Sequence, residues 1–353
     1  MKNTMVFFYT EDGSTENRGT HDILTRSENR FIKVLKTDSY LYLLEKLYEN
    51  KVVDSIRIII VSNREPGFTY IGKYNFPVYV VPNIWDSECL INKNDILFYR
   101  GGFRSWHDFI VRKKEQSFFN MLYAANTGRE RWKFWDLILE DLDTEKQRSD
   151  KYNRIWFPFS KPVNQDIFKP LFNVKKKYDI CIGASHIHDK KGQWRVINAI
   201  IQNQYLKKLK YVMPGSKRRG TKTNEMYEIV KKYRLNIEFP GMLDRNKLAK
   251  VYNQSRLFVY GGEGGQNDRS LLESLACGTD ILFIKPNRHA HFLKSYYYTS
   301  NLTIGILFKL HKARSRSKEW VVDRYNMSNG LNRTIDQFRR IIKIKLDKDK
   351  GVM

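Results

Sequence analysis

The chain has 353 residues, and its 63 Lys and Arg against 38 Asp and Glu give a formal net charge of +25. Hydrophobic residues make up 41% and aromatic residues 14%, which excludes a disordered chain. No apolar run approaches the ~18 residues of a membrane helix, and no signal-peptide pattern opens the sequence. The three cysteines are far apart and form no CxxC pair. We therefore expect a soluble, cytoplasmic protein of two domains without a structural metal.

The positive charge is concentrated in the second half of the chain. Residues 1–170 contain 26 Lys and Arg against 23 Asp and Glu, whereas residues 171–353 contain 37 against 15. Such an asymmetry indicates that the second half meets an anion. A polyphosphate ligand, an acidic membrane surface and nucleic acid are the candidate partners, nucleic acid being the least favoured.

The first half alternates short apolar runs with helix-like spacing. Strand-like runs occur at 6–9, 56–62, 78–81, 96–99, 121–125, 137–139 and 155–157. Between the first two, apolar residues from Phe31 to Leu47 recur at helical spacing. This alternation predicts βαβ units and a parallel sheet in a first domain over 1–170. A Pro-rich, basic connector over 162–177 separates it from a second domain over 171–353.

The alternation restarts in the second half. Strands are predicted at 178–183, 210–213, 237–239, 257–260 and 280–284, and helices at 194–203, 224–233, 245–253 and 269–276. A final segment, about 330–346, has the spacing of an amphipathic helix, and its return to the first domain is an expectation. The predicted fold is thus α/β, with two Rossmann-like doubly wound domains and a ligand site in the cleft between them.

The segment with the strongest chemical signal is 260–283, YGGEGGQNDRSLLESLACGTDILF. A strand ends at Tyr260, four glycines follow, and a helix begins near Asp268. Glycines before a helix N-terminus leave backbone N–H groups free to approach an anion or sugar hydroxyls. Glu273, one turn into this helix, is placed to accept hydrogen bonds from a ribose diol. The competing interpretation is an ordinary strand–turn–helix with a solvent-facing glutamate.

This segment resembles the donor-binding signature of glycosyltransferase family 4, an E-G-x-G loop, a helix with a second Glu, and A-x-A-C-G-x-P. Three upstream blocks are similar to the same family: IEFPGMLDRNKLAKVYNQSRLFVY at 237–260, ICIGASHIHDKKGQW at 180–194 and PVNQDIFKP at 162–170. Four blocks in the family order over about 120 residues make the resemblance specific.

The resemblance implies the GT-B fold, with the nucleotide-sugar bound by the second domain and the acceptor mainly by the first. It implies a metal-independent hexosyltransferase that needs no cofactor and retains the anomeric configuration. The donor-binding residues that it implies are Lys191, Gly265, Gln266, Asn267, Glu273 and Gly241. The family's phosphate-binding Arg after the first Gly is missing here, and the candidate substitutes are Ser185, Arg269 and the cluster Lys217–Arg219. Lys191 takes the place of a diphosphate ligand and Glu273 that of the ribose-binding Glu.

The sequence departs from the family pattern at the catalytic positions. Glu263 and Glu273 are ten residues apart where the family has eight, so either residues 266–269 hold a two-residue insertion or Gly265 stands in the place of the first Glu. The family often has a His at the end of a central strand of the acceptor domain. The matching position here is Asn126, and His107 is the alternative candidate for the role of that His. The catalytic candidates are therefore Glu263, Asn126 and His107. In the acceptor domain, the candidates are Gly19 in the first loop, with Arg100 and Arg104.

Three functions remain open from sequence. The first is transfer of a hexose from GDP-mannose, with UDP-glucose second, to a glycan, lipid or protein acceptor, as a monomer or a homodimer. The second is a glycosyltransferase acting on nucleic acid through the basic stretches 207–210, 217–222 and 309–318. The third is a non-catalytic protein that binds a nucleotide-sugar or an acidic membrane surface.

Overall fold

The computed structural model divides the chain into two compact units, Met1–Pro162 with Asn332–Met353, and Val163–Leu331. It describes residues 3–10, 39–62, 66–100, 104–124, 132–140, 154–159, 162–183, 186–187, 191–217, 221–262, 269–283, 301–313, 321 and 331–350. Within these ranges, no helix has both the length and the apolar character that a membrane crossing demands.

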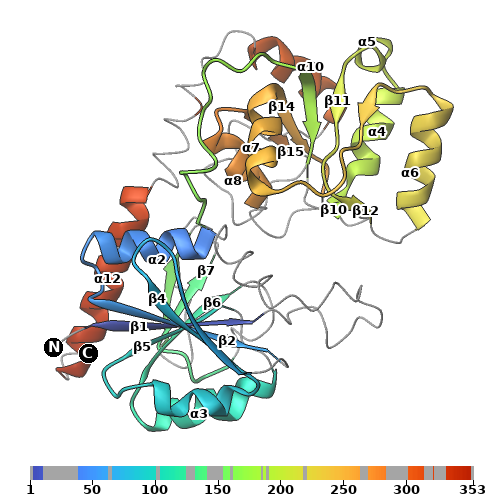
Figure 1. Cartoon of the computed structure of the whole chain (residues 1–353). Coiled ribbons are helices and arrows are strands. Elements are labelled where there is room, and N and C mark those ends of the chain that lie inside the picture. Colours follow the sequence, from blue (N-terminus) through green and yellow to red (C-terminus); the bar gives the residue numbers. More distant parts are fainter. Residues whose placement is uncertain are drawn as a thin grey trace. The chain divides into compact units, whose positions relative to one another are not determined.

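The first unit is built on an eight-stranded sheet in the order β3-β4-β2-β1-β5-β6-β7-β8 (Figure 1). Its neighbouring strands are parallel except for the antiparallel pair of β3 with β4. The strands are β1 (Thr4–Thr10), β2 (Ser55–Val61), β3 (Gly67–Ile71), β4 (Phe76–Val81), β5 (Ile96–Arg100), β6 (Phe119–Ala124), β7 (Leu137–Glu140) and β8 (Ile155–Pro158). The predicted parallel sheet is confirmed. The edge strand β3, which forms a hairpin with β4, was not predicted from the sequence.

Aromatic rings dominate the core of the first unit. The rings of Phe8 and Tyr99 stack with centroids 4.6 Å apart, and those of Phe7 and Tyr40 with centroids 5.6 Å apart. Such pairs stabilise a core by more than the area they bury. The helices that cover the sheet are α2 (Ser39–Glu49) and α3 (His107–Glu115), with two short 3-10 turns, η1 (Ile84–Leu90) and η2 (Arg104–Trp106).

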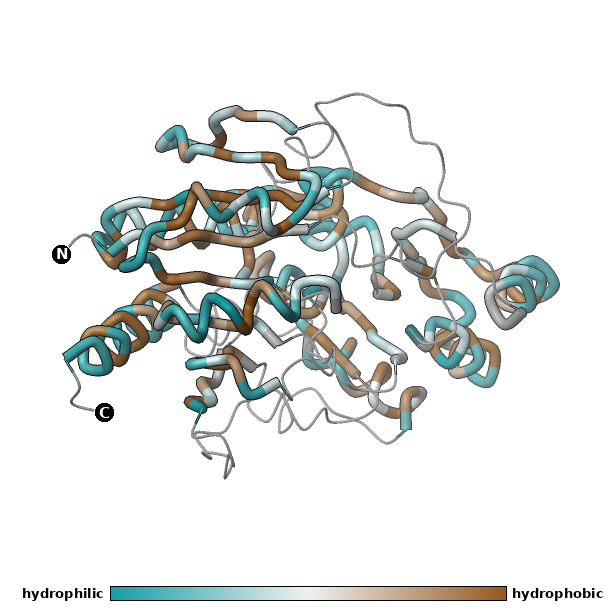
Figure 2. Tube along the Cα trace, turned by 90° about the horizontal axis from the view of Figure 1, so that it is seen from below, coloured by the Kyte–Doolittle hydropathy of each residue, from teal (hydrophilic) through white to brown (hydrophobic). Residues whose placement is uncertain are grey.

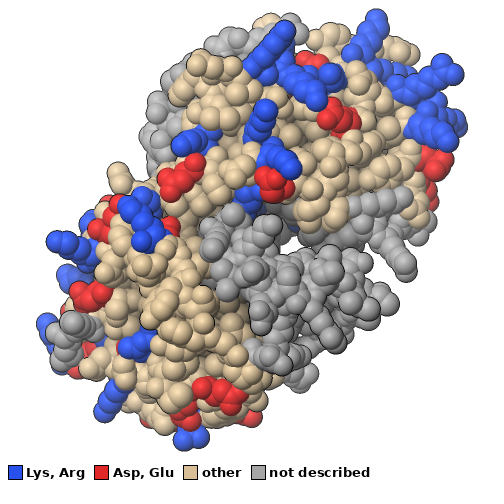
Figure 3. Space-filling view, viewed as in Figure 1, with Lys and Arg blue, Asp and Glu red and all other residues tan. Residues whose placement is uncertain are grey.

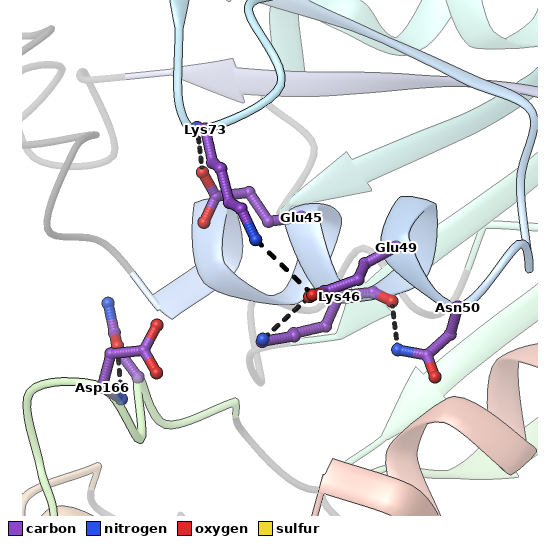
Figure 4. A network of polar contacts seen from close by, with 7 residues as sticks. Glu45, Lys46, Glu49, Asn50, Lys73 and Asp166 are labelled. Carbon is purple, nitrogen blue, oxygen red and sulfur yellow. Dashed lines mark hydrogen bonds and ion pairs between the residues drawn. The ribbon is translucent and has the colours of Figure 1, made fainter.

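Polar contacts hold the turn between β3 and β4 against α2 (Figure 4). The amide of Lys73 donates to Glu45 Oε1 at 2.6 Å, and the Lys73 ammonium lies 3.6 Å from Glu49. Lys46 also pairs with Glu49, at 2.8 Å. Salt bridges this exposed contribute little stability, so their main effect is to fix the direction of the hairpin.

The C-terminal helix α12 (Leu331–Asp349) belongs to the first unit, which confirms the expected return of the last helix to that domain. Brown hydrophobic residues recur along it in Figure 2, in the helix that leads to the C-terminus. Its Phe338 is fully buried and meets the rings of Phe98 and Phe159 at centroid distances of 6.1 and 5.7 Å. The apolar stripe of α12 therefore packs against β5 and completes the core on that face of the sheet.

The second unit has a five-stranded parallel sheet in the order β13-β11-β9-β14-β15. Its strands are β9 (Tyr178–Ile182), β11 (Tyr211–Val212), β13 (Ile237–Glu238), β14 (Ser255–Tyr260) and β15 (Asp280–Phe283), with a separate pair, β10 (His186–Ile187) and β12 (Ser216–Lys217). The helices are α4 (Gln193–Ile201), α5 (Gln204–Lys207), α6 (Thr221–Lys232), α7 (Arg245–Gln254), α8 (Arg269–Ala276) and α10 (Leu302–Ala313). From β9 the chain adds β11 and β13 on one side of the sheet and then β14 and β15 on the other side. A topological switch point therefore lies between β9 and β14.

Candidate active site

The strands β9 and β14 end side by side at the carboxyl edge of the second sheet. Gly183 follows β9, and its amide donates to the carbonyl oxygen of Val259 at 2.8 Å. A Cβ added to Gly183 would lie 1.8 Å from the ring of Phe258. The chain can therefore leave β9 across β14 only because residue 183 has no side chain.

Two glycine-containing segments then meet at this edge. Gly192 precedes α4 with φ 67°, and a Cβ on it would lie 1.8 Å from the carbonyl oxygen of Gly261. In the opposite direction, a Cβ on Gly261 would lie 2.1 Å from the carbonyl oxygen of Gly192. Both positions require glycine, so the backbone entering α4 packs directly against the start of the glycine-rich loop.

Lys191 is fixed by this contact. Its half-buried side chain places Nζ 5.9 Å from the centroid of the Tyr260 ring, in cation–π contact. Gly262 also lies over this ring, since a Cβ there would be 2.6 Å from it. An ammonium group, the N-terminus of α4 and the glycine-rich loop are thus gathered at one edge. Together they form a positive environment suited to a phosphate group.

Glu273 lies on α8 and is 4% exposed, so it is not the solvent-facing glutamate of the competing interpretation. Its Oε1 accepts a hydrogen bond from Arg245 Nη1 at 3.0 Å. Arg245 is the first residue of α7, which begins with Asp244 as its N-cap. Arg245 was missed in the sequence reading, although its place after the Gly241 turn offered a signal. The charge-assisted hydrogen bond holds the Glu273 carboxylate in one orientation.

Gly241, in the turn after β13, is hydrogen-bonded to the turn after β11 at the same edge of the sheet. Its carbonyl oxygen accepts the amide of Gly215 at 2.8 Å, which links the segments that follow β13 and β11. Gly241 has φ 72°, and a Cβ placed on it would meet no heavy atom within 4 Å. The space next to the Gly241 Cα is therefore open, so a planar group of a ligand could pack against the backbone there.

Several predicted site residues lie outside the described part of the chain. In the second unit they are Ser185, Glu263, Gly265, Gln266 and Asn267, and in the first unit Asn126 and Gly19. Arg269 is described as the first residue of α8 and is half-buried. The backbone of Arg104 is described in η2, but its side chain is not.

His107 opens α3 in the first unit. Its Nδ1 lies 2.9 Å from Asp108 Oδ1, and its ring stands edge-on to Trp132 and Phe134 at centroid distances of 4.9 and 5.2 Å. One ring edge thus packs in an aromatic setting while the side chain stays 40% exposed. His107 therefore packs against two aromatic rings and is also accessible to solvent.

Arg100 ends β5, and two tyrosine rings hold it. The guanidinium carbon lies 4.3 Å from the centroid of Tyr40 and 4.9 Å from that of Tyr9. Since β1 and β5 are parallel neighbours, both Tyr9 and Arg100 stand at the carboxyl edge of the first sheet. Arg100 is thus a cation fixed in place at the edge where doubly wound domains bind ligands.

The basic stretch 309–318, one of those that suggested nucleic-acid binding, begins with a buried lysine. Lys309 on α10 is 4% exposed, and its Nζ lies 3.5 Å from Asp280. The family pattern has Pro at the position of Asp280. The aspartate that replaces this Pro forms the ion pair with Lys309 of α10. Lys309 therefore cannot contact a nucleic-acid phosphate. In the described ranges, no three His, Cys, Asp or Glu side chains are grouped as a metal site would require.

The family Glycosyl transferases group 1 matches residues 164–318, which is nearly all of the second unit. A search of curated proteins found no significant match to the chain.

Solved structures are similar over both units. The Anabaena protein HepE, in complex with UDP and glucose, has a TM-score of 0.68 at 9% identity and covers 96% of this chain and 99% of its own. A glycosyltransferase from Rickettsia africae scores 0.64 at 13% identity, with 98% of each chain covered. An E. coli trehalose-6-phosphate structure bound with UDP-2-fluoro glucose scores 0.63 at 10% identity, covering 97% and 99%.

Fold and site together define a nucleotide-sugar glycosyltransferase with the GT-B fold. Over residues 164–318 the chain matches the model of glycosyl transferases group 1, and the predicted resemblance to family 4 is confirmed.

Proposed function

We propose that the protein is a retaining hexosyltransferase whose second unit binds a nucleotide-diphosphate sugar and whose first unit binds a glycan, lipid or protein acceptor. The observation that carries the proposal is the contact of Lys191–Gly192 with Gly261–Gly262. It joins a cation, a helix N-terminus and a glycine-rich loop at a topological switch point.

Lys191 is the proposed ligand of the donor diphosphate. Negative charge grows on the diphosphate as the glycosidic bond breaks, and a fixed ammonium group stabilises that charge in the transition state. The N-terminus of α4 adds its partial positive charge at the same place. These groups supply the stabilisation that a divalent cation gives elsewhere, so the proposal includes neither a metal nor a cofactor.

Glu273 is the proposed ribose ligand, and Arg245 is its positioning residue. A carboxylate can accept hydrogen bonds from both hydroxyls of a cis-diol while its other lone pairs face a guanidinium. The open space over Gly241 is proposed for the nucleotide base. Ser185, Gly265, Gln266, Asn267 and Arg269 remain proposed contacts to the phosphates and sugar, as the resemblance implies.

In the proposed reaction the bond from the anomeric carbon to the diphosphate breaks, and the acceptor hydroxyl bonds to the same carbon on the same face. The hydroxyl proton passes to the departing diphosphate oxygen, so no protein carboxylate has to act as a strong base. Glu263, with Asn126 or His107, is proposed to contact the reacting sugar. In the acceptor site, Gly19 and Arg104 are proposed contacts, and Arg100 is suited to a sugar face or an acidic group of the acceptor.

For the donor, we propose a UDP-hexose ahead of GDP-mannose. The sequence reading put GDP-mannose first, but two of the similar solved structures hold UDP with glucose or UDP-2-fluoro glucose. UDP-glucose is therefore the first donor to test.

The test is calorimetric titration of UDP-glucose, UDP-N-acetylglucosamine, GDP-mannose, UDP and GDP into the wild type and Lys191→Ala. One nucleotide-sugar should bind, and Lys191→Ala should weaken it by about 10- to 100-fold, since hydrogen bonds between charged groups contribute about 1.5–3 kcal/mol. Lys250→Ala, an exposed lysine on α7, is the matched control and should bind like the wild type.

Donor hydrolysis and transfer to oligosaccharides, measured on the same variants, separate catalysis from binding. A folded wild type that binds none of the five nucleotides would contradict the donor site. Binding without turnover on any acceptor would favour the non-catalytic alternative.

A further inference from the structure

Three lysine-rich runs of the second unit occupy equivalent places in the fold. Residues 175–177, 207–210 and 231–234 read KKK, KKLK and KKYR, and they end just before β9, β11 and β13 begin. These three strands are parallel neighbours in the sheet. All three runs therefore reach the amino edge of the sheet, the edge opposite the proposed donor site.

Backbone hydrogen bonds hold the runs next to each other. The amide of Lys177 donates to the carbonyl oxygen of Gln254, that of Asp179 to Lys210, and that of Tyr211 to Asn236, each at 2.9 Å. The four segments joined in this way, 171–179, 204–210, 231–238 and 253–256, form what we call the amino-edge surface. It contains ten Lys and Arg residues but two acidic residues, Asp179 and Glu238.

Both acidic residues are already paired within the surface. Glu238 binds Lys177 at 2.9 Å, and Asp179 lies 3.6 Å from Arg256. Lys208, Lys231, Lys232 and Arg234 are all exposed. Figure 3 shows blue side chains gathered in this region, over α5 and the adjoining end of α6. The surface thus keeps a strong excess of positive charge.

Exposed apolar side chains lie among these cations. Phe172 is 63% exposed, Tyr205 49%, Tyr233 43% and Leu171 37%. The connector that carries Leu171 is fixed to α7, because the Leu171 amide donates to Asn253 Oδ1 at 2.7 Å. Lysines around exposed aromatic and aliphatic groups are the composition of a surface that meets lipid headgroups.

We propose that the amino-edge surface docks the protein on an anionic membrane. Eight of its ten cations are Lys, and lysine acts as a point charge suited to the diffuse field of a lipid surface, whereas bidentate phosphate recognition favours Arg. Phe172 and Leu171 give an apolar contact that the phosphate backbone of a nucleic acid does not use. Docking by this edge leaves the carboxyl edge, with its proposed donor site, on the side of the sheet away from the lipid.

The experiment is co-sedimentation of the full-length protein with phosphatidylcholine vesicles, with or without phosphatidylglycerol. The wild type should bind only the anionic vesicles, and added salt should weaken the binding. The double variant Lys208→Glu/Lys231→Glu should lower partitioning by about tenfold or more, because each basic residue near the surface contributes on the order of a fivefold gain. Phe172→Ser should give a smaller loss.

The matched control is Lys93→Glu/Lys343→Glu, which changes the net charge equally at exposed lysines of the first unit. An equal loss in this control would overturn the proposal, since net charge alone would then explain the binding. No binding to anionic vesicles would also overturn it. So would tight, Lys208- and Lys231-dependent binding of duplex DNA or RNA without vesicle binding. Titration of the nucleotide-sugars into both double variants keeps this outcome separate from the donor site, which neither should affect.

Discussion

The two units each bury an aspartate beside a helix from later in the chain, but they neutralise it differently. In the first unit, Asp136 pairs with two ammonium groups, Lys114 of α3 and Lys348 of α12, and accepts the amide of Asn120 at 2.9 Å. In the second unit, the ion pair described for Asp280 is with the buried ammonium group of Lys309, at 3.5 Å.

The difference shows what each aspartate does for its unit. Asp280 and Lys309 carry opposite unit charges, so this ion pair is electrically neutral by itself. Asp136 serves two cations, and burial together with the neighbouring Lys114 lowers the pKa of Lys348 to about 8. Asp136 is therefore the buried anion, among the described residues, that pairs with both lysines where α12 brings them together.

The largest expected effect follows from removing that anion. Asp136→Asn keeps the shape but leaves Lys114 and Lys348 next to each other, which should lower the free energy of unfolding by about 3–5 kcal/mol. Urea unfolding followed by tryptophan fluorescence measures it, since Trp135 is buried beside this position. Asp347→Asn on α12 is the control, with a change of less than about 0.5 kcal/mol. Equal effects of the two variants would show that Asp136 has no special role.

A smaller loss is expected in the second unit. Lys309→Met removes the cation that faces Asp280 and should cost about 3 kcal/mol in unfolding free energy. The double variant Lys309→Met/Asp280→Ala should recover part of this loss, because it also removes the buried charge. A double variant less stable than Lys309→Met would mean that the aspartate stabilises β15 by contacts other than this ion pair.

The smallest effect is a pH dependence confined to the first unit. The pKa of Lys348 is about 8 in the folded protein and near 10.5 in the unfolded chain, so between these values the unfolded state binds more protons. Stability should therefore rise with pH in this window. Because the Lys348 side chain is 44% exposed, solvent screening keeps the gain below about 1 kcal/mol. Lys348→Gln should flatten the profile in urea unfolding, and an unchanged slope would contradict the assignment.

Most of the parallel strands and the return of the last helix could be predicted from sequence. Buried parallel strands such as β2 and β14 are continuous apolar runs, and the spacing of Ile335, Phe338, Ile341 and Ile342 marks one face of a helix. Strand β3 was missed because GFTYI is short and exposes both of its aromatic residues, Phe68 and Tyr70, so it lacks the apolar run of a buried strand. The turn that joins it to β4 depends on positive φ angles at Gly72 and Asn75, which composition alone does not reveal.

The glycines of the site were easier to predict than its charge pairs. Gly192 and Gly261 stand in segments with a recognisable order, and their need for glycine follows from one close backbone contact. Arg245 and Glu273 are 28 residues apart in sequence, and nothing local links them. The same holds for Asp136 with Lys348. Net charge is readable from composition, whereas the partner of each charge depends on the tertiary fold.

The division of the chain has a consequence for its synthesis. The second unit is continuous, Val163–Leu331, whereas the first unit needs both Met1–Pro162 and Asn332–Met353. On the ribosome, the N-terminal part of the first unit emerges first but lacks α12 until residues 331–349 have been made, so the second unit can fold before the first is complete. A chain cut short before α12 would contain a finished second unit, while the aromatic core of its first unit would still be open to water.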